Sequence, residues 1–370
     1  MTALPPGLDR LPSGKIRARY RDAEGRQHSK SFPPRGGIRA AQAWLRDQRS
    51  TVDAGTHVAP NDRTTVRDFA ERWARSRPHR ESTRRQVVTY LRHLDETPLG
   101  ARPLRLVRPS EVQEFISNRN AAGYAPQTVR NLYTWIRAVF SAAVEDRLIL
   151  HTPCTRKIVL PKLVKDEIVP LTVEQVRALA EAMEPRYAAG VLLQAATGVR
   201  ISELLALQVR DVDFLRRTVR VERQLSRNGR EFVEPKSEHG YRTIPLATEV
   251  VEALSQHVAA YPPNEDGVLL TTTHGNPIRQ DLFTCVQFRR AAQVAGLSDV
   301  TPHDLRHHFA SVLLMMGLPT NVVAKYLGHG SSRLVEETYG HVMPGADDLA
   351  RGALDTLWGQ PGEAPSRFSI

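Results

Sequence analysis

The stretch TPHDLRHHFASVLLMMGLPTNVVAKYLGHGSSRLVEETYGHV, residues 301–342, decides how the C-terminal part of the chain is interpreted. Its first part predicts a helix, because Thr301 is a suitable N-cap and Pro302 suits the first helical position. His303 and Arg306 lie three residues apart on this helix and therefore project from one face. An imidazole and a guanidinium on one face are suited to binding phosphate.

The second part of the stretch carries two tyrosines near a histidine. His329 lies in the segment LGH, and Tyr339 follows it ten residues later. Tyr326 is a rival nucleophile, but its place in VVAKYLGH favours a packed helix face. A phenol with its ordinary pKa of about 10 is a poor nucleophile and needs neighbours that favour loss of its proton. Taken alone, Tyr339 is better interpreted as a buried tyrosine with a hydrogen bond.

Two upstream stretches add residues of the same chemical types. ATGVRISELLAL (196–207) predicts a helix that starts at Arg200, with Glu203 within reach on the same face. EPKSEHGYRTIPL (234–246) predicts a hairpin turn at Lys236 before a strand. The chain has no GxxxxGK[ST] loop, and its histidines have no Cys or carboxylate cluster at zinc-like spacing. We therefore expect no nucleotide-hydrolysing loop and no metal site.

Together these residues resemble the active site of the tyrosine recombinases. The matching elements are an Arg in a TGxRxSEL segment, a Lys in a β-turn, HxxR, LGH, and a Tyr ten residues beyond that His. They occur in the family's order, over about residues 172–345. The catalytic candidates are Arg200, Lys236, His303, Arg306, His329 and Tyr339. Arg306 is followed by His307 and His308, where the family more often has a His and then a small hydroxyl residue. This departure bears on packing and not on chemistry.

The resemblance implies a role for each candidate. Arg200 and Arg306 suit a clamp on the non-bridging oxygens of a phosphodiester, where negative charge builds during attack. The two histidines would bind the phosphate and assist proton transfer, the lysine would protonate the departing 5′-hydroxyl, and the tyrosine would form a 3′-phosphotyrosyl link. Glu203 would be a supporting residue that orients Arg200. No cofactor is required.

The net charge of +11 is unevenly distributed along the chain. Residues 1–62 carry 11 Lys and Arg against 6 Asp and Glu, and residues 63–165 carry 20 against 9. Residues 166–370 carry 20 against 25. Such a basic N-terminal part indicates a polyanionic partner, and its arginines suit bidentate phosphate contacts. We expect double-stranded DNA to be gripped mainly by the first 165 residues.

Residues 1–58 predict a small α+β module, which would bind arm-type DNA sites. KIRARYRD and RQHSKSF alternate as two strands around a turn at 23–25, and a helix is expected from about 38 to 52. Such a hairpin could lie in a DNA groove, although a solvated hairpin is an equal alternative. Its candidate DNA-binding residues are Arg17, Arg19, Arg21, Arg26 and Lys30.

The remainder of the chain predicts a multidomain protein. Residues 64–155 predict an all-α core-binding domain with basic outer faces that include Arg84 and Arg85. Its four helices are expected to open at Thr65, Ser82, Ser110 and Pro126. A linker at 156–170 precedes a mixed, mainly-α α+β catalytic domain at 171–350, with a strand at 218–224 and a second hairpin in 232–246. Residues 351–370 predict a C-terminal tail.

We interpret the chain as an integrase that joins an attachment site on a phage or mobile element to one on a host chromosome. Recombination of two duplexes implies a DNA-bound homotetramer, and a DNA-bending protein or directionality factor could assist. The alternatives are a chromosome-dimer-resolving or transposon-type tyrosine recombinase, a type IB topoisomerase, and a non-catalytic DNA-binding regulator with a decayed site. The extra N-terminal module argues against a resolvase.

The composition favours a cytoplasmic, nucleoid-associated protein. No apolar run approaches the roughly 20 residues that span a bilayer, and the N-terminus has no apolar signal region. Cys154 and Cys285 are expected to be isolated thiols, which fits a reducing compartment.

Overall fold

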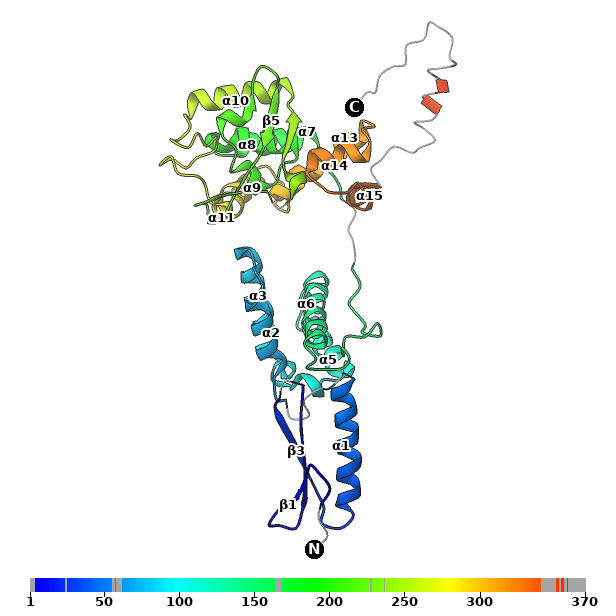
Figure 1. Ribbon diagram of the computed structural model, residues 1–370. Coiled ribbons are helices and arrows are strands. Elements are labelled where there is room, and N and C mark those ends of the chain that lie inside the picture. Colours follow the sequence, from blue (N-terminus) through cyan, green and yellow to red (C-terminus); the bar gives the residue numbers. More distant parts are fainter. Residues whose placement is uncertain are drawn as a thin grey trace. The chain divides into compact units, whose positions relative to one another are not determined.

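The computed structural model (Figure 1) divides into two compact units, Met1–Lys165 and Asp166–Ile370. This boundary falls inside the expected linker at 156–170. Lys236, residues 341–350 and most of the expected tail lie outside the described residues. No helix in the described part of the chain is long and apolar enough to cross a membrane. The structure describes residues 4–23, 25–54, 57, 62–163, 168–226, 228–235, 237–340, 351–352, 354–355 and 358.

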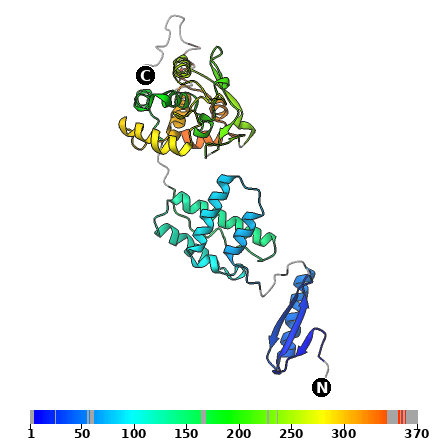
Figure 2. The same cartoon turned by 90° about the vertical axis from the view of Figure 1, so that its left-hand side faces the viewer.

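The N-terminal module is a three-stranded antiparallel sheet covered on one face by a helix (Figure 2). Alternation along the middle strand buries Ile16, Ala18 and Tyr20, which pack with Ala41 and Leu45 of the helix. The sheet order is β1-β2-β3, so each outer strand pairs with the middle one. The elements are β1 (Leu8–Arg10), β2 (Ile16–Arg21), β3 (Gln27–Phe32) and α1 (Gly37–Asp53).

The second part of the first unit is all-helical. At the start of α2, the Thr65 side chain accepts a hydrogen bond from the Asp68 backbone at 3.1 Å, as its spacing predicts. The second and third helices begin earlier than the expected Ser82 and Ser110. Pro109 takes the first position of α5, where its missing N–H costs nothing. The helices are α2 (Val66–Arg75), α3 (Glu81–Asp95), α4 (Pro98–Ala101), η1 (Leu104–Leu106), α5 (Pro109–Ala121) and α6 (Pro126–Glu145).

The core of this helical domain follows the apolar stripe of its longest helix. Leu132, Ile136 and Phe140 of α6 are buried against Phe69 of α2 and Phe115 of α5. Trp73 and Trp135 lie in an edge-to-face arrangement at its border, with ring centroids 6.5 Å apart. These aromatic side chains pack in or beside the core.

The second unit is mainly helical with two small sheets (Figure 1). Its strands are β4 (Val212–Asp213), β5 (Thr218–Val221), β6 (Gln224–Leu225), β7 (Phe232–Val233) and β8 (Arg242–Pro245). Its N-terminal helices are α7 (Val173–Ala182), α8 (Pro185–Thr197) and α9 (Ile201–Leu204), followed by η2 (Val209–Asp211). The later helices are η3 (Glu238–Gly240), α10 (Thr248–Ala260), α11 (Gln280–Leu282), the π-helix η4 (Phe283–Phe288), α12 (Arg289–Val294), α13 (Pro302–Met315), α14 (Thr320–Leu327) and α15 (Arg333–Tyr339).

The strand expected at 218–224 is divided into β5 and β6. The two strands expected to form a hairpin in 232–246, β7 and β8, do not pair with each other. β5 ends at Val221, and β6 starts a separate two-stranded sheet with β7. β8 does not pair with β7 but returns to β5. Between β5 and β6, Arg223 turns to the buried carboxylate of Asp211 at 2.5 Å. This ion pair lies where β5 and β6 divide, and it gives the buried carboxylate the partner that it needs.

Candidate active site

A tight turn after α8 sets the position of Arg200. Gly198 ends the helix with φ of +63°, a left-handed conformation that favours glycine. A Cβ at this position would lie 2.4 Å from Phe309 Cδ1, so the close approach of α13 also requires glycine. The turn makes Arg200 the N-cap of α9, with its side chain 40% exposed. The Arg200 side chain is therefore partly exposed, while its Nη1 and Nη2 donate to Glu203 and to the Gly328 carbonyl at 3.0 and 3.4 Å.

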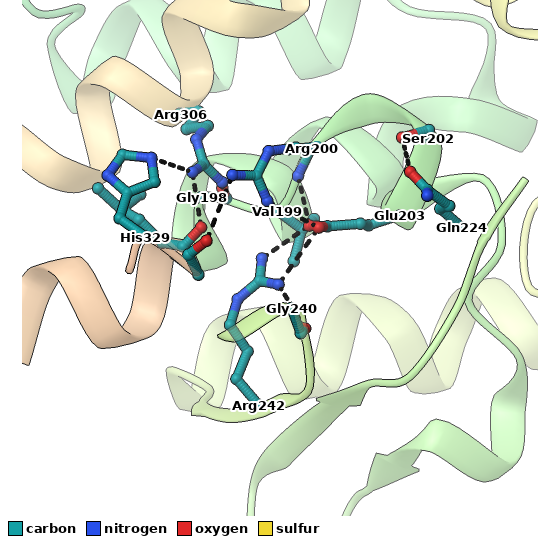
Figure 3. Close-up of polar contacts among 12 residues, drawn as sticks. Gly198, Val199, Arg200, Ser202, Glu203, Gln224, Gly240, Arg242, Arg306 and His329 are labelled. Carbon is teal, nitrogen blue, oxygen red and sulfur yellow. Dashed lines mark hydrogen bonds and ion pairs between the residues drawn. The ribbon is translucent and has the colours of Figure 1, made fainter. Parts of the chain in front are cut away.

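Glu203 connects Arg200 with a second arginine, Arg242 (Figure 3). Its Oε1 accepts a hydrogen bond from Arg200 Nη1 at 3.0 Å, and its Oε2 accepts one from Arg242 Nη2 at 2.7 Å. Burial alone would raise the pKa of Glu203, but the hydrogen bonds and charges of Arg242 and Arg200 hold it below its usual range. Glu203 therefore stays ionised and accepts hydrogen bonds from both arginines.

Arg242 is a residue that the sequence interpretation missed. It is the first residue of β8, and its side chain is 2% exposed. Its Nε donates to the Tyr326 carbonyl at 2.6 Å and its Nη1 donates to the Gly240 carbonyl at 2.9 Å. Together with the bond to Glu203, these bonds join β8 to α9, η3 and α14. A signal was present in RTIPL, because Arg242 alternates with Ile244 on the buried face, and a buried arginine needs an acidic partner.

Arg306 is the most enclosed charge of the site. It is 2% exposed and donates to two backbone carbonyls, from Nη1 to Gly198 and from Nη2 to Leu327, both at 2.6 Å. Burial and the nearby Arg200 lower the pKa of Arg306 to about 9, which leaves it charged at neutral pH. Two backbone bonds fix the plane of its guanidinium, so its remaining donors have a set direction.

His329 lies beside this guanidinium (Figure 3). Its Nε2 is 2.8 Å from Arg306 Nη2, which can only donate, so the imidazole accepts through Nε2 and carries its proton on Nδ1. Burial and the charge of Arg306 lower the pKa of His329 to about 4, in agreement with a neutral ring. The buried Nδ1 has no hydrogen-bond partner among the described residues. It is therefore an available donor for an oxygen of a ligand.

His303 and His307 lie one turn apart on α13 with their rings in edge-to-face contact. Their ring centroids are 4.6 Å apart and the planes make an angle of 82°. Burial, together with the charge of Arg306, lowers the pKa of His303. Burial also lowers the pKa of His307 to about 4. Both rings are therefore neutral at pH 7 and can accept protons only weakly.

Tyr339 ends α15 and is buried, with 3% of its surface exposed. Its phenol oxygen lies 2.6 Å from His307 Nδ1. Burial raises the pKa of Tyr339 to about 12, although the charge of Arg306 acts in the opposite direction. The phenol is therefore protonated in this arrangement. His308, which follows His307 on α13, does not contact the phenol; its Nδ1 lies 2.6 Å from the Leu171 carbonyl oxygen.

Five of the six catalytic candidates thus lie in one region of the second unit, and the sixth, Lys236, lies outside the described residues. They come from the start of α9, from α13, from the turn after α14 and from α15. The arrangement can hold an anion by two guanidiniums and an imidazole N–H beside a phenol, which is suited to attack on a phosphate ester. His307, which the sequence interpretation treated as packing detail, contacts the phenol directly.

Comparison with known proteins identifies this arrangement. Residues 170–345 match the sequence model of the phage integrase family. This domain belongs to the phage integrase family. The resemblance to the tyrosine recombinases is confirmed, and the protein is a tyrosine-type site-specific recombinase.

Relatives of this tyrosine recombinase extend the likeness beyond the matched domain. The putative prophage phiRv2 integrase of Mycobacterium tuberculosis is 27% identical over 93% of this chain and 93% of its own length. The Tn1549 transposon integrase bound to transposon right end DNA covers 80% of this chain and 99% of its own, with TM-score 0.70 and 24% identity. A lambda integrase tetramer bound to a Holliday junction covers 90% of this chain and 97% of its own, with TM-score 0.58 and 19% identity. The two structures share a multidomain fold with this recombinase.

The basic residues of the recombinase's N-terminal hairpin are divided between the two faces of its sheet. Arg17, Arg19 and Arg21 alternate on the face opposite α1, where Asp9 forms ion pairs with the first two at 2.5 and 3.1 Å. Lys30 pairs with Ala18 across the strands and lies on the helix side, with its ammonium 5.4 Å from the centroid of the Phe32 ring. Arg26 follows the turn. Three of the five candidates therefore share the sheet face opposite α1, and Lys30 lies on the other face.

The two basic candidates of the helical domain, Arg84 and Arg85, are exposed on α3. Arg85 forms an ion pair with Glu81 one turn earlier. Arg84 forms no ion pair with any residue that the structure describes, so its charge is the more available of the two.

Proposed function

We propose that this recombinase is an integrase that cuts and rejoins DNA through a covalent bond to Tyr339, to insert or remove a phage or another mobile element. The observation that carries the proposal is the group formed by a buried phenol, two fixed guanidiniums and neutral imidazoles. No other described tyrosine of the second unit has such neighbours: Tyr326, the rival in sequence, uses its carbonyl to hold Arg242.

The proposed step is a transfer of one phosphodiester bond. The phenol oxygen of Tyr339 attacks phosphorus, the Oη–P bond forms, and the bond from phosphorus to the 5′-oxygen breaks. The phenol loses its proton and the 5′-oxygen gains one, so charge balances and the energy of the ester is kept in the 3′-phosphotyrosine. The reverse reaction, with a 5′-hydroxyl from another strand, completes recombination without a cofactor.

Each neighbour has a defined part in this step. Arg306 and Arg200 hold the non-bridging oxygens, where negative charge increases in the transition state. His329 donates its free Nδ1–H to one of them, and His303 lies beside the same oxygens. A phosphate bound here also carries the negative charge that raises the pKa values of the histidines towards the neutral range. Lys236 is the acid for the 5′-oxygen, a role that rests on the family resemblance.

The DNA partners are assigned by charge and by the relatives. The basic helical domain and the catalytic domain would hold core sites, and the N-terminal module would hold arm sites through Arg17, Arg19 and Arg21. Homologous integrases in complex with DNA, one of them a tetramer on a Holliday junction, support a DNA-bound homotetramer. A DNA-bending protein or directionality factor could assist. The prophage integrase likeness extends over nearly the whole chain, which favours an integrase over a resolvase that lacks the module.

A nicked suicide duplex, in which the cleaved fragment diffuses away, tests the proposal. The wild-type protein should form a covalent complex that resists denaturation by detergent. Tyr339→Phe should bind the same DNA with unchanged affinity and form no complex, while Tyr326→Phe, the matched control, should still form it. A covalent complex with Tyr339→Phe would refute the assignment. Relaxation of a plasmid that has no attachment site would instead favour a topoisomerase.

A further inference from the structure

The hydrogen bond between His307 and Tyr339 joins two helices of the catalytic domain. His307 lies in the second turn of α13 and Tyr339 is the last residue of α15. The 2.6 Å separation of Nδ1 and the phenol oxygen is short, and the ring centroids are 5.5 Å apart. A second bond, from Thr320 Oγ1 to Glu336 at 3.0 Å, connects α15 with the start of α14. The short helix that carries the nucleophile is therefore fixed at its end by His307.

The direction of this hydrogen bond follows from the chemistry of the two groups. The phenol has one proton to give, and a neutral imidazole accepts through the nitrogen that carries no hydrogen. Nδ1 of His307 is then the acceptor and Nε2 carries the hydrogen. The His303 ring also contacts His307, so His307 contacts both a phosphate-binding candidate and the nucleophile.

A neutral imidazole in this position could act as a base or as a positioning group. The burial that lowers the pKa of His307 to about 4 and raises that of Tyr339 to about 12 strongly opposes proton transfer within the resting pair. The same burial favours a hydrogen bond between the neutral partners, because a buried phenol without a hydrogen-bond partner would cost free energy. The geometry therefore supports positioning.

We propose that His307 is a positioning residue for the nucleophile: its Nδ1 accepts the hydrogen bond of the Tyr339 phenol and sets the direction of the oxygen beside His303 and Arg306. The proposal rests on the proposed function of Tyr339. The neighbouring His308 has no part in it, because its ring bonds to Leu171 instead. His307 should therefore affect the rate of strand cleavage and not the affinity for DNA.

Three variants distinguish positioning from the alternatives. The side-chain oxygen of an asparagine can occupy the place of Nδ1 and accept a hydrogen bond, but it cannot take up a proton. His307→Leu, of similar size, can do neither. His274→Leu, on an exposed turn, is the matched control. Single-turnover formation of the covalent complex on the nicked duplex gives the rate, and binding of intact duplex gives the dissociation constant.

Positioning predicts a rate about tenfold or more lower in His307→Leu, the equivalent of one hydrogen bond, with recovery of most of the rate in His307→Asn. The dissociation constants should be unchanged. A wild-type rate in His307→Leu would overturn the proposal, and so would equal losses in the leucine and asparagine variants, which indicate a base. If the wild-type protein forms no covalent complex, the proposed function fails instead.

Nuclear magnetic resonance of ¹⁵N-histidine-labelled protein tests the contact without relying on catalysis or on the leucine variant's folding. The His307 signals, assigned by their loss in His307→Asn, should show hydrogen on Nε2 and an accepting Nδ1. Tyr339→Phe should shift the Nδ1 signal towards that of a free acceptor nitrogen. An unchanged Nδ1 signal in Tyr339→Phe would overturn the proposal.

Discussion

Replacing Arg242 with methionine would remove the charged partner of a buried carboxylate while keeping much of the side chain's volume. The wild-type guanidinium makes bonds to Glu203 at 2.7 and 3.3 Å and to two backbone carbonyls. Side-chain exposure is 2% for Arg242 and 5% for Glu203, so water cannot replace these bonds. Breaking a buried ion pair by removing one partner costs about 3–5 kcal/mol.

This cost corresponds to a large change in thermal stability. In a domain of about 150–250 residues, each kcal/mol lowers the unfolding temperature by about 2–4 °C, so Arg242→Met should lower it by about 6–20 °C. The control is Arg177→Met, because Arg177 pairs with Glu249 at 2.9 Å with both side chains more than half exposed. Such a surface pair contributes about 0–1 kcal/mol.

Differential scanning calorimetry of the full chain measures both shifts. Covalent complex formation should also be slower in Arg242→Met, because Glu203 would then hold Arg200 more tightly and away from phosphate. A shift in Arg242→Met no larger than that in Arg177→Met would refute the assignment of Arg242 as the buried support of the site.

Three further predictions concern the turn, the histidines and the DNA contacts. Gly198→Ala should cost more stability than Gly275→Ala, about 2–4 against about 1 kcal/mol in urea unfolding, because both have positive φ but only the first Cβ meets a neighbour, at 2.4 Å from Phe309. Burial lowers the pKa values of His303, His307 and His329 in the folded protein. Below the ordinary histidine pKa of about 6.5, the unfolded chain therefore binds more protons than the folded protein. Stability should therefore be fully present above that pKa and fall as the pH drops from about 6.5 towards 4, and the fall should be smaller in His307→Asn. Arg84→Gln should reduce the slope of DNA affinity against salt concentration by about 1, whereas Arg177→Gln should not, as fluorescence titrations can measure.

Local features of the fold were predictable from sequence because they depend on neighbouring residues. The helix starts at Thr65, Pro126 and Thr301 follow from capping chemistry, and the HxxR spacing places His303 and Arg306 on one face. The helices α3 and α5 begin one residue before the serines that were expected to open them, because a serine beside a proline or arginine is an ambiguous cap. Where β5 and β6 divide, Arg223 forms an ion pair with Asp211, and no local pattern connects these two residues.

The site was less predictable where partners are far apart in sequence. Glu203 was expected to serve Arg200 three residues away, but its more buried partner, Arg242, comes from β8. The contact between His307 and Tyr339 joins two helices and needs the fold to be known. Lys30 shows the same limit, because strand register places it on the opposite face from Arg17. The catalytic roles of the six candidates stay predictions.

Mapping the covalent bond to one residue tests the central claim most directly. The wild-type protein would be trapped on the nicked duplex, digested with nuclease and trypsin, and analysed by fragmentation mass spectrometry. We predict that the remaining nucleotide is attached through its 3′-phosphate to Tyr339, in the tryptic peptide of residues 334–351. Attachment to Tyr326, in the peptide of residues 326–333, or to any other residue would contradict the assignment.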